Sequence, residues 1–239
     1  MKNNLLIALF ASFIVACSSS IDIVQNSNLP KEHLIFLNDG LSVNSKQMSE
    51  KILFPIKYVS FPTRESLLPN AIRAYRNGIH EGIDIVANYN TPVYASLSGV
   101  VVVANSSYKD LNINQYNEFL SKTSKIKKTP RDIYTHILLG KYVIIDHGFD
   151  FVKGFRTTTT YAHLSQLHGN ILSGASVKKG DLIGYIGNTG TKYGAQGNNA
   201  GAHLHWEMHF ENTDNIYYLG QNIKKKQFIE LTKKIFERE

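Results

Sequence analysis

Residues 201–207, with the sequence GAHLHWE, place two histidines one residue apart inside an apolar and aromatic run. In an extended strand alternate side chains share a face, so His203, His205 and Glu207 are predicted to point to one side of a sheet. The intervening leucine and tryptophan then point to the other side, which we interpret as the core-facing side. Imidazoles in a row above a sheet suit a metal site or a site that transfers protons. A pair of ordinary surface histidines is the alternative that this stretch alone leaves open.

A second stretch, residues 78–85 with the sequence GIHEGIDI, offers matching chemistry. His80 and Asp84 are an even number of residues apart, so a strand places both on one face, and a helical turn does so too. Gly82 between them leaves space above the backbone. Two imidazole nitrogens and one carboxylate oxygen from the two stretches form a suitable ligand set for zinc. Three protein ligands leave the fourth tetrahedral position open for water, which is typical of a catalytic rather than a structural site.

With both stretches in place, the sequence resembles the lysostaphin/LytM-type zinc endopeptidases, which cut peptidoglycan cross-links. The resemblance covers roughly residues 76–210, interrupted by two insertions, and its motifs occur in the order of the family. The further motifs that carry it are residues 91–95, 98–101, 143–148, 161–165, 177–180 and 187–190.

The resemblance implies the roles of five residues. His80, Asp84 and His205 would bind one zinc ion per chain, and His163 and His203 would line the site. Zinc lowers the pKa of bound water to roughly 7 and polarises a carbonyl. A nearby base that removes the proton contributes about 10²- to 10⁴-fold. His163 and His203 would act as proton acceptor and as hydrogen-bond donor to water or the tetrahedral oxyanion, and the sequence does not divide the two roles.

Other polar residues near these motifs have open interpretations. Glu207 either orients a metal ligand or is a solvent-facing carboxylate. Arg73 and Arg76 suit recognition of a substrate carboxylate, although most arginines are solvated or structural. The remaining histidines are given no role in the site, with a structural position expected for His147 and surface positions for His168 and His209.

The start of the chain is typical of an exported lipoprotein. Residues 1–16 form a short basic and apolar stretch, too short to span a membrane and typical of a signal peptide. Residues 14–17 resemble a lipobox, so we expect cleavage before Cys17 and lipid attachment there; a free thiol is the alternative. Two or more acyl chains hold a protein on a bilayer. Ser18 resembles the residue that sorts lipoproteins of diderm bacteria to the outer membrane, which predicts a location in the cell envelope, facing the periplasm.

The rest of the chain divides into a few segments. We expect a tether or N-terminal arm at 17–50, a LytM-type zinc peptidase domain at 51–220 and a C-terminal helix at 221–239. That helix is expected to be solvated, with contact to lipid headgroups as the alternative. Within the domain, the insertion at 105–140 contains a predicted helix and is expected to flank the groove and gate or guide substrate. The second insertion, 191–202, is rich in Gly and Asn and is expected to be a mobile rim loop.

Short strands with glycine turns predict an all-β or β-dominated fold. The resemblance implies an antiparallel sheet core of the lysostaphin/LytM type, with a helical insertion and a C-terminal helix. The expected strands include residues 52–60, 141–146, 157–161 and 182–186, together with two short strands within 92–104 that are joined at residues 98–99.

The net charge of the chain and the distribution of its lysines limit the classes of binding partner that we expect. The net charge of +7 falls to about +6 without Lys2, and the lysines are scattered rather than gathered into a patch with aromatic residues, so a nucleic-acid partner is not expected. A mild positive excess suits an anionic envelope polymer or a membrane surface, consistent with peptidoglycan and a lipid anchor.

The function that these observations predict is zinc-dependent hydrolysis of peptide cross-links in peptidoglycan. A diderm host would suggest the D-alanyl to meso-diaminopimelate bond. The main alternative is a non-catalytic LytM-like envelope protein that binds peptidoglycan or activates an amidase, although such members usually lose ligands. A cupin-like metal protein also uses His-x-His, but there the pair precedes its other ligands. A structural envelope tether with a vestigial site is the third alternative.

Overall fold

The computed structural model describes residues 34–38, 41–44, 48–152 and 154–237, with side chains from residue 48 onward. The predicted signal peptide and Cys17 lie outside the described residues, as does most of the predicted tether. No helix in this described part is both long enough and apolar enough to cross a membrane.

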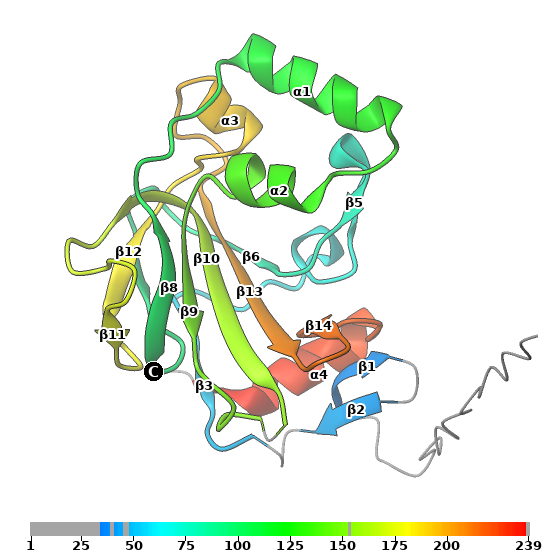
Figure 1. Ribbon diagram of the computed structural model, residues 1–239, viewed down its shortest axis with the longest axis vertical. Coiled ribbons are helices and arrows are strands. Elements are labelled where there is room, and N and C mark those ends of the chain that lie inside the picture. The colour runs from blue at the N-terminus through cyan, green and yellow to red at the C-terminus, as the bar shows by residue number, and fades with distance from the viewer. Residues whose placement is uncertain (1–33, 39–40, 45–47, 153, 238–239) are drawn as a thin grey trace, which may run out of the picture.

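The molecule is built around a nine-stranded sheet in which all neighbouring strands are antiparallel. Figure 1 shows this sheet at the centre of the molecule. Its path runs β11-β8-β9-β10-β12-β7, and β13 pairs with β10, β14 and β6. The strands are β6 (Ile83–Val86), β7 (Pro92–Tyr94), β8 (Gly99–Asn105), β9 (Lys141–Asp146), β10 (Arg156–Leu167), β11 (Ser176–Val177), β12 (Leu182–Ile186), β13 (His203–Glu211) and β14 (Ile216–Tyr218). This sheet confirms the predicted β-dominated fold class.

The local patterns locate several strands well. The β-branched run of β9 and the apolar run of β12 have the bounds expected from sequence. β7 and β8 are the two short strands expected within 92–104; they do not pair with each other, since β7 pairs with β12 and β8 lies between β9 and β11. The strand predicted at 157–161 is longer, because β10 continues through the site to Leu167. The strand predicted at 52–60 is wrong beyond β3 (Ile52–Leu53), since Pro55 cannot donate a ladder hydrogen bond.

Several short strands and helical turns lie outside the nine-stranded sheet. β1 (Leu34–Asn38) and β2 (Leu41–Asn44) form an antiparallel hairpin, and β4 (Ile72–Arg73) pairs with β5 (Gly78–Ile79). Short helical turns lie at η3 (Glu65–Leu67) and η4 (Ala74–Arg76).

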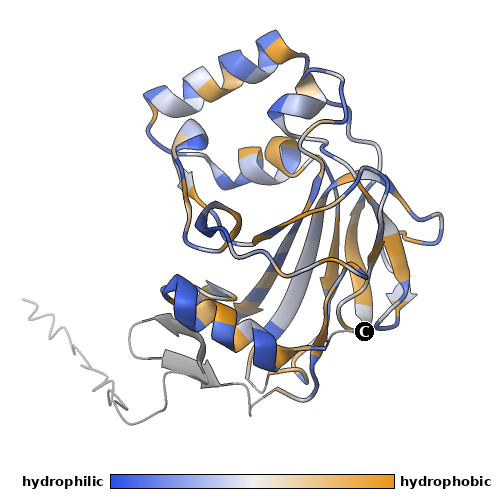
Figure 2. Ribbon diagram, turned by 180° about the vertical axis from the view of Figure 1, so that it is seen from behind, coloured by the Kyte–Doolittle hydropathy of each residue, from blue (hydrophilic) through white to orange (hydrophobic). Residues whose placement is uncertain are grey.

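The C-terminal helix is part of the main core. α4 (Lys225–Ile235) buries one face there, and Figure 2 shows that it carries both hydrophilic and hydrophobic residues. After it, β15 (Phe236–Glu237) pairs in parallel with β3, and Phe236 contacts Trp206 at a ring-centroid distance of 5.5 Å. The expectation of a solvated helix is therefore wrong for this face, whose buried residues are Phe228, Leu231, Thr232 and Ile235.

The first insertion covers one end of the sheet. Its predicted helix is α1 (Ile113–Lys125), which begins with a capping box between Asn112 and Gln115. Pro130 then precedes α2 (Arg131–Ile133), which continues into the π-helical turn η5 (Tyr134–Leu138). The second insertion contains the short helix α3 (Lys192–Ala195), so it is not loop alone. In Figure 1 these helices gather above the upper ends of β10 and β13.

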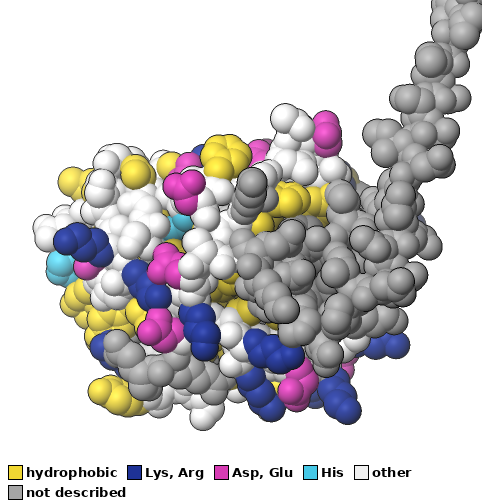
Figure 3. Space-filling view, turned by 90° about the horizontal axis from the view of Figure 1, so that it is seen from below, with side chains coloured by type: hydrophobic (Ala, Val, Ile, Leu, Met, Phe, Trp, Pro, Cys, Tyr) yellow, Lys and Arg dark blue, Asp and Glu magenta, His cyan; other side chains and the backbone are white. Residues whose placement is uncertain are grey.

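Basic and acidic side chains are interspersed on the face that Figure 3 shows. The ion pairs show the same mixing of charges, since Lys179 lies 2.8 Å from a carboxylate oxygen of Glu237 and 3.4 Å from one of Glu50. This mixing agrees with the scattered lysines of the sequence.

Candidate metal centre

Three predicted ligands converge where β6 meets β13. Asp84 on β6 and His205 on β13 are directly opposite each other in the antiparallel ladder. His80 does not share the strand with Asp84 as expected; it lies after β5, and the chain reaches β6 through Gly82. A Cβ atom at Gly82 would lie 2.5 Å from the Trp206 carbonyl oxygen, so only glycine lets this connection pass so close to β13.

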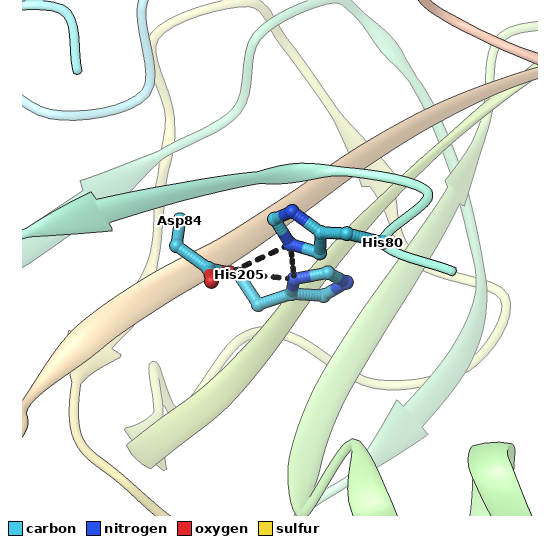
Figure 4. Close-up of side chains that lie close together, drawn as sticks. All are labelled: His80, Asp84 and His205. Atoms are coloured by element: carbon cyan, nitrogen blue, oxygen red, sulfur yellow. Dashed lines mark hydrogen bonds and ion pairs between the residues drawn. The ribbon is translucent and has the colours of Figure 1, made fainter. Parts of the chain in front are cut away.

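The ligand atoms form a compact triangle, seen in Figure 4. His80 Nε2 lies 2.9 Å from Asp84 Oδ1 and 3.1 Å from His205 Nδ1, and His205 Nδ1 lies 2.9 Å from Asp84 Oδ1. At zinc–ligand bonds of about 2.0–2.1 Å, the corners of a tetrahedron lie about 3.3 Å apart. The triangle is therefore of the right size and chemistry for one zinc ion.

Outer hydrogen bonds orient two of these ligands. His80 Nδ1 lies 2.8 Å from the Leu68 carbonyl, so it carries the proton and leaves Nε2 free to bind a metal. Arg73 Nη2 donates to Asp84 Oδ2 at 2.6 Å, which leaves Oδ1 facing the histidines. Each ligand atom is thus presented in a fixed orientation.

The third ligand is oriented by Glu207. His205 Nε2 lies 2.8 Å from Glu207 Oε1, and only 2% of Glu207 is exposed to solvent. Tyr134 donates its hydroxyl proton to the same oxygen at 2.5 Å. Of the two interpretations of Glu207, its position supports the orienting role and is incompatible with a solvent-facing carboxylate.

The electrostatics of the site favour a bound cation. Burial by itself would raise the pKa of Asp84, but His80 and His205 hold it well below its usual range. Burial would also raise the pKa of Glu207, but the hydrogen bond with His205 lowers the pKa of this carboxylate below its usual value. Burial would lower the pKa of His205, whereas Asp84 and Glu207 raise it to about 9. Two buried, ionised carboxylates need a positive partner, either a protonated imidazole or a metal ion.

His163 and His203 lie beside the triangle with their rings 4.7 Å apart between centroids. His163 lies at a bulge of β10 and has a left-handed backbone conformation with φ 60°. The residues before it pair with β13, and those after it pair with β12. Its Nδ1 donates to the Thr189 carbonyl at 2.8 Å, and His203 Nδ1 donates to the Gly201 carbonyl at 2.7 Å. Both rings therefore keep Nε2 as an acceptor in the neutral form.

The surroundings keep His163 neutral. Burial and the neighbouring histidines His203 and His205 lower the pKa of His163 well below its usual value. His203 Nε2 lies 3.8 Å from Asp84 Oδ1, so this second ring borders the ligand triangle directly. A neutral imidazole next to a metal centre is the form that accepts a proton from water.

A cleft of about 380 Å³ unites the five predicted residues. The three ligands and both additional histidines line it. One wall comes from the first insertion, which confirms that this insertion flanks the groove; its lining residues are Tyr116, Leu120, Tyr134, Leu138 and Leu139. The second insertion contributes Lys192 and Tyr193 to the rim.

The two arginines near the site have partners within the chain. Arg73 donates to Asp84 and, through Nη1, to the Ser66 carbonyl at 2.6 Å. Arg76 is only 7% exposed and donates to the Ile79 carbonyl at 2.6 Å. Acceptors of the chain thus engage both guanidinium groups, which favours the structural interpretation of the two arginines over recognition of a substrate carboxylate.

Two residues of the site region were missed by sequence reasoning. His209 was expected at the surface but is only 7% exposed, and its Nε2 lies 3.3 Å from Glu81 Oε2. The alternation along β13 could have found it, since His209 has the same parity as His205. Tyr134 comes from the insertion, and no sequence signal connected it to the site.

His147 is structural as expected, because it contacts the Ser98 carbonyl and the Thr159 hydroxyl, each at 2.8 Å.

The chain is similar to known proteins in sequence and in structure. The peptidoglycan DD-endopeptidase ShyA of Vibrio cholerae serotype O1 is 30% identical over 129 residues, which is 54% of this chain and 20% of that protein. The chain therefore spans only a small part of the curated relative that it matches.

Two solved structures are among those to which the chain is similar. A putative glycyl-glycine endopeptidase LytM from Ruminococcus gnavus is 20% identical, with 80% of this chain and 64% of that chain covered and a TM-score of 0.46. The catalytic domain of the antimicrobial peptidase lysostaphin from Staphylococcus simulans is 21% identical, with 69% and 84% covered and a TM-score of 0.36.

The family model of peptidase family M23 matches residues 78–217. This range contains His80, Asp84, His163, His203 and His205. Because the match covers more than half of the chain, the protein belongs to peptidase family M23.

Proposed function

We propose that the protein is a zinc-dependent endopeptidase that hydrolyses peptide cross-links of bacterial peptidoglycan. The observation that carries the proposal is the triangle of His80, Asp84 and His205 ligand atoms, all within 3.1 Å of one another on the wall of a cleft. Membership of a peptidase family supports the reaction type. The relative described as a peptidoglycan DD-endopeptidase supports the substrate class.

The side chains of the site fit this chemistry. When bound, zinc activates water at neutral pH and polarises the scissile carbonyl. His163 and His203 each bond a backbone carbonyl through Nδ1 beside the ligand triangle, so the neutral form of either ring offers Nε2 to the proton of the attacking water. The resulting imidazolium then donates a proton to the leaving amine or a hydrogen bond to the oxyanion. Such a base contributes about 10²- to 10⁴-fold to the rate.

Within this class, we propose the D-alanyl to meso-diaminopimelate bond as the substrate. Stem peptides that form this cross-link carry free carboxylates, and the exposed Lys192 lies on the rim of the cleft. The net charge of +7 also favours encounter with an anionic polymer.

We further propose that the protein is lipid-anchored at Cys17 in the bacterial cell envelope, at the outer membrane and facing the periplasm. The support is the lipobox-like sequence at residues 14–17 and the serine that follows it. A periplasmic position would place the cleft beside peptidoglycan.

The test is digestion of purified sacculi by the zinc-loaded protein, followed by mass analysis of the muropeptides. We expect cross-linked dimers to fall and monomers to rise, with masses that locate hydrolysis at the D-alanyl to meso-diaminopimelate bond. Cleavage at another peptide bond would overturn the assigned bond but keep the enzyme. If the protein binds sacculi and zinc but releases nothing, the non-catalytic binding protein replaces the proposal.

A further inference from the structure

Glu207 is a buried carboxylate that depends on a small number of donors. His205 Nε2 lies 2.8 Å from its Oε1, and His209 Nδ1 lies 3.8 Å from its Oε2. The Tyr134 hydroxyl, at 2.5 Å from Oε1, is the shortest of these contacts. A buried charge without hydrogen-bond donors is costly, so the loss of this hydroxyl would weaken the orientation of the carboxylate.

The Tyr134 hydroxyl, Glu207 Oε1 and His205 Nε2 form a second triangle of close contacts, on the Nε2 side of the His205 ring. The hydroxyl lies 3.0 Å from His205 Nε2 as well as 2.5 Å from Glu207 Oε1. The tyrosine proton goes to the carboxylate, and with Nδ1 as the metal-facing atom the protonated Nε2 of His205 has both oxygens within hydrogen-bond distance. The ring of Tyr134 also meets the His205 ring edge-on, at 85° and a centroid distance of 6.5 Å. His205 is thus held on the side opposite to its Nδ1.

Tyr134 is in turn held tightly by charged side chains. The Arg76 guanidinium lies over its ring at 4.6 Å from the centroid, and that of Arg131 lies at 5.9 Å. Arg131 also pairs with Glu81 Oε2 at 3.0 Å, which ties α2 to the turn that follows His80. In addition, the Thr129 hydroxyl donates to the Arg76 carbonyl. These contacts fasten the insertion to the wall of the site.

We propose that Tyr134 is a positioning residue, which the insertion supplies to the metal centre and which orients His205 through Glu207. The inference rests on the proposed zinc ion at His80, Asp84 and His205. In this view residues 105–140 are more than a rim of the cleft, because the ligand triangle lacks one of its supports without them. Groups that orient a histidine ligand typically affect metal affinity about 10- to 100-fold.

A simpler account is that Tyr134 only fills space in the apolar cluster around Tyr142, Leu138 and Ala162. Tyr134→Phe separates the two accounts, because it keeps the ring and removes the hydroxyl. Tyr142→Phe is the matched control: Tyr142 belongs to the same cluster but does not line the cleft.

The experiment measures zinc affinity by competition with a chromophoric chelator, together with thermal unfolding of the metal-free proteins. We expect Tyr134→Phe to bind zinc about 10- to 100-fold more weakly than wild type, and Tyr142→Phe to bind it as wild type does. Equal affinities of Tyr134→Phe and wild type would overturn the inference. Failure of the wild type itself to bind zinc would instead overturn the proposed function, and this inference with it.

A double-mutant cycle with Glu207→Gln tests whether Tyr134 acts through Glu207. We expect the double variant to bind zinc within about twofold of Glu207→Gln alone, because the tyrosine no longer has a carboxylate to orient. A further tenfold loss in the double variant would overturn this route. Glu207→Gln alone keeps the inference testable if Tyr134→Phe does not fold: we expect it to bind zinc about 10- to 100-fold more weakly than wild type, and wild-type affinity would overturn the inference.

Discussion

At the scale of single residues, His203 and His205 lie on the same face of β13 but have different partners. His205 lies between Asp84 and Glu207, and its ring nitrogens are within 2.9 Å of an oxygen of each. His203 instead donates a hydrogen bond from Nδ1 to the Gly201 carbonyl. One ring therefore completes the ligand triangle, and the other borders it with a free acceptor nitrogen. This difference leads to opposite expectations for two neighbouring substitutions.

His205→Ala should purify with little zinc, and added zinc should restore little activity, because one of three ligands is lost. His203→Ala should retain zinc near one ion per chain, yet lose about 10²-fold or more in activity on the usual scale for a general base. His80→Ala and Asp84→Ala should behave like His205→Ala, and His163→Ala like His203→Ala. Metal analysis of the five folded variants is the measurement. Loss of zinc in His203→Ala with retention in His205→Ala would reverse the assignment.

Arg73→Ala should weaken zinc binding, because Asp84 Oδ2 loses the guanidinium that donates to it at 2.6 Å. Removal of such an outer partner typically costs about 10- to 100-fold in metal affinity. Chelator competition and the KM for a cross-linked peptide should be measured together. A raised KM with unchanged zinc affinity would show that Arg73 instead holds the substrate, the alternative that the sequence left open.

At the scale of elements, the first insertion has two parts with different duties. The turn η5 supplies Tyr134 to the metal centre, whereas α1 contributes Tyr116 and Leu120 to the wall of the cleft. The last turn of α1 is basic, with Lys122 and Lys125. Removal of the whole insertion would disturb both parts, so the guiding role expected for it must be tested on α1 alone.

Replacement of residues 112–126 by a Gly/Ser bridge should leave zinc binding intact, since Tyr134 remains. We expect activity on intact sacculi to fall more than activity on a small cross-linked peptide, because α1 offers a wall and positive charge to the polymer. Digestion of both substrates by the same preparation is the measurement. Equal losses on the two substrates, in a folded and zinc-loaded variant, would contradict a role in substrate guidance.

The helix α4 is expected to contribute to global stability because its buried face belongs to the main core. Phe228→Ala should lower the free energy of unfolding by about 3–5 kcal/mol, the usual cost of truncating a buried phenylalanine. Lys226→Ala, at an exposed position of the same helix, is the control and should change it by less than about 0.5 kcal/mol. Denaturant unfolding of both variants provides the comparison. A small effect of Phe228→Ala would mean that α4 is a solvated appendage after all.

At the scale of the whole molecule, the sheet brings together residues that are far apart in the chain. β13 joins the segment that contains Asp84 to β10, which contains His163, so the centre of the sheet assembles the site. The remaining segment of functional interest, residues 1–17, lies outside the described residues. Its proposed role concerns where the enzyme works rather than how the site is built.

Cys17→Ala should leave the protein soluble or unprocessed, because Cys17 is the single cysteine of the chain and the proposed site of lipid attachment. Fractionation of membranes, with mass analysis of the mature form, is the measurement. If the variant still fractionates with membranes at the mature mass of the wild type, the proposed lipid anchor is contradicted.

Local patterns in the sequence were sufficient for part of this structure. Alternation along residues 203–207 predicted which side chains share a face, and β-branched runs predicted β9 and β12 with their bounds. The polar stretch 112–126 with its scattered apolar positions predicted α1. These features depend on neighbours within a few residues, so the sequence alone determines them.

Contacts between distant segments were decided only by the tertiary structure. Tyr134 and Glu207 are 73 residues apart, and no local pattern in the insertion indicates that its tyrosine reaches a buried carboxylate on β13. The exposure of α4 was misjudged for the same reason, because an amphipathic helix does not reveal what its apolar face contacts. Such pairs form when the folded sheet and the insertion exclude water from the same space, which makes the hydroxyl and the carboxylate each other's partners.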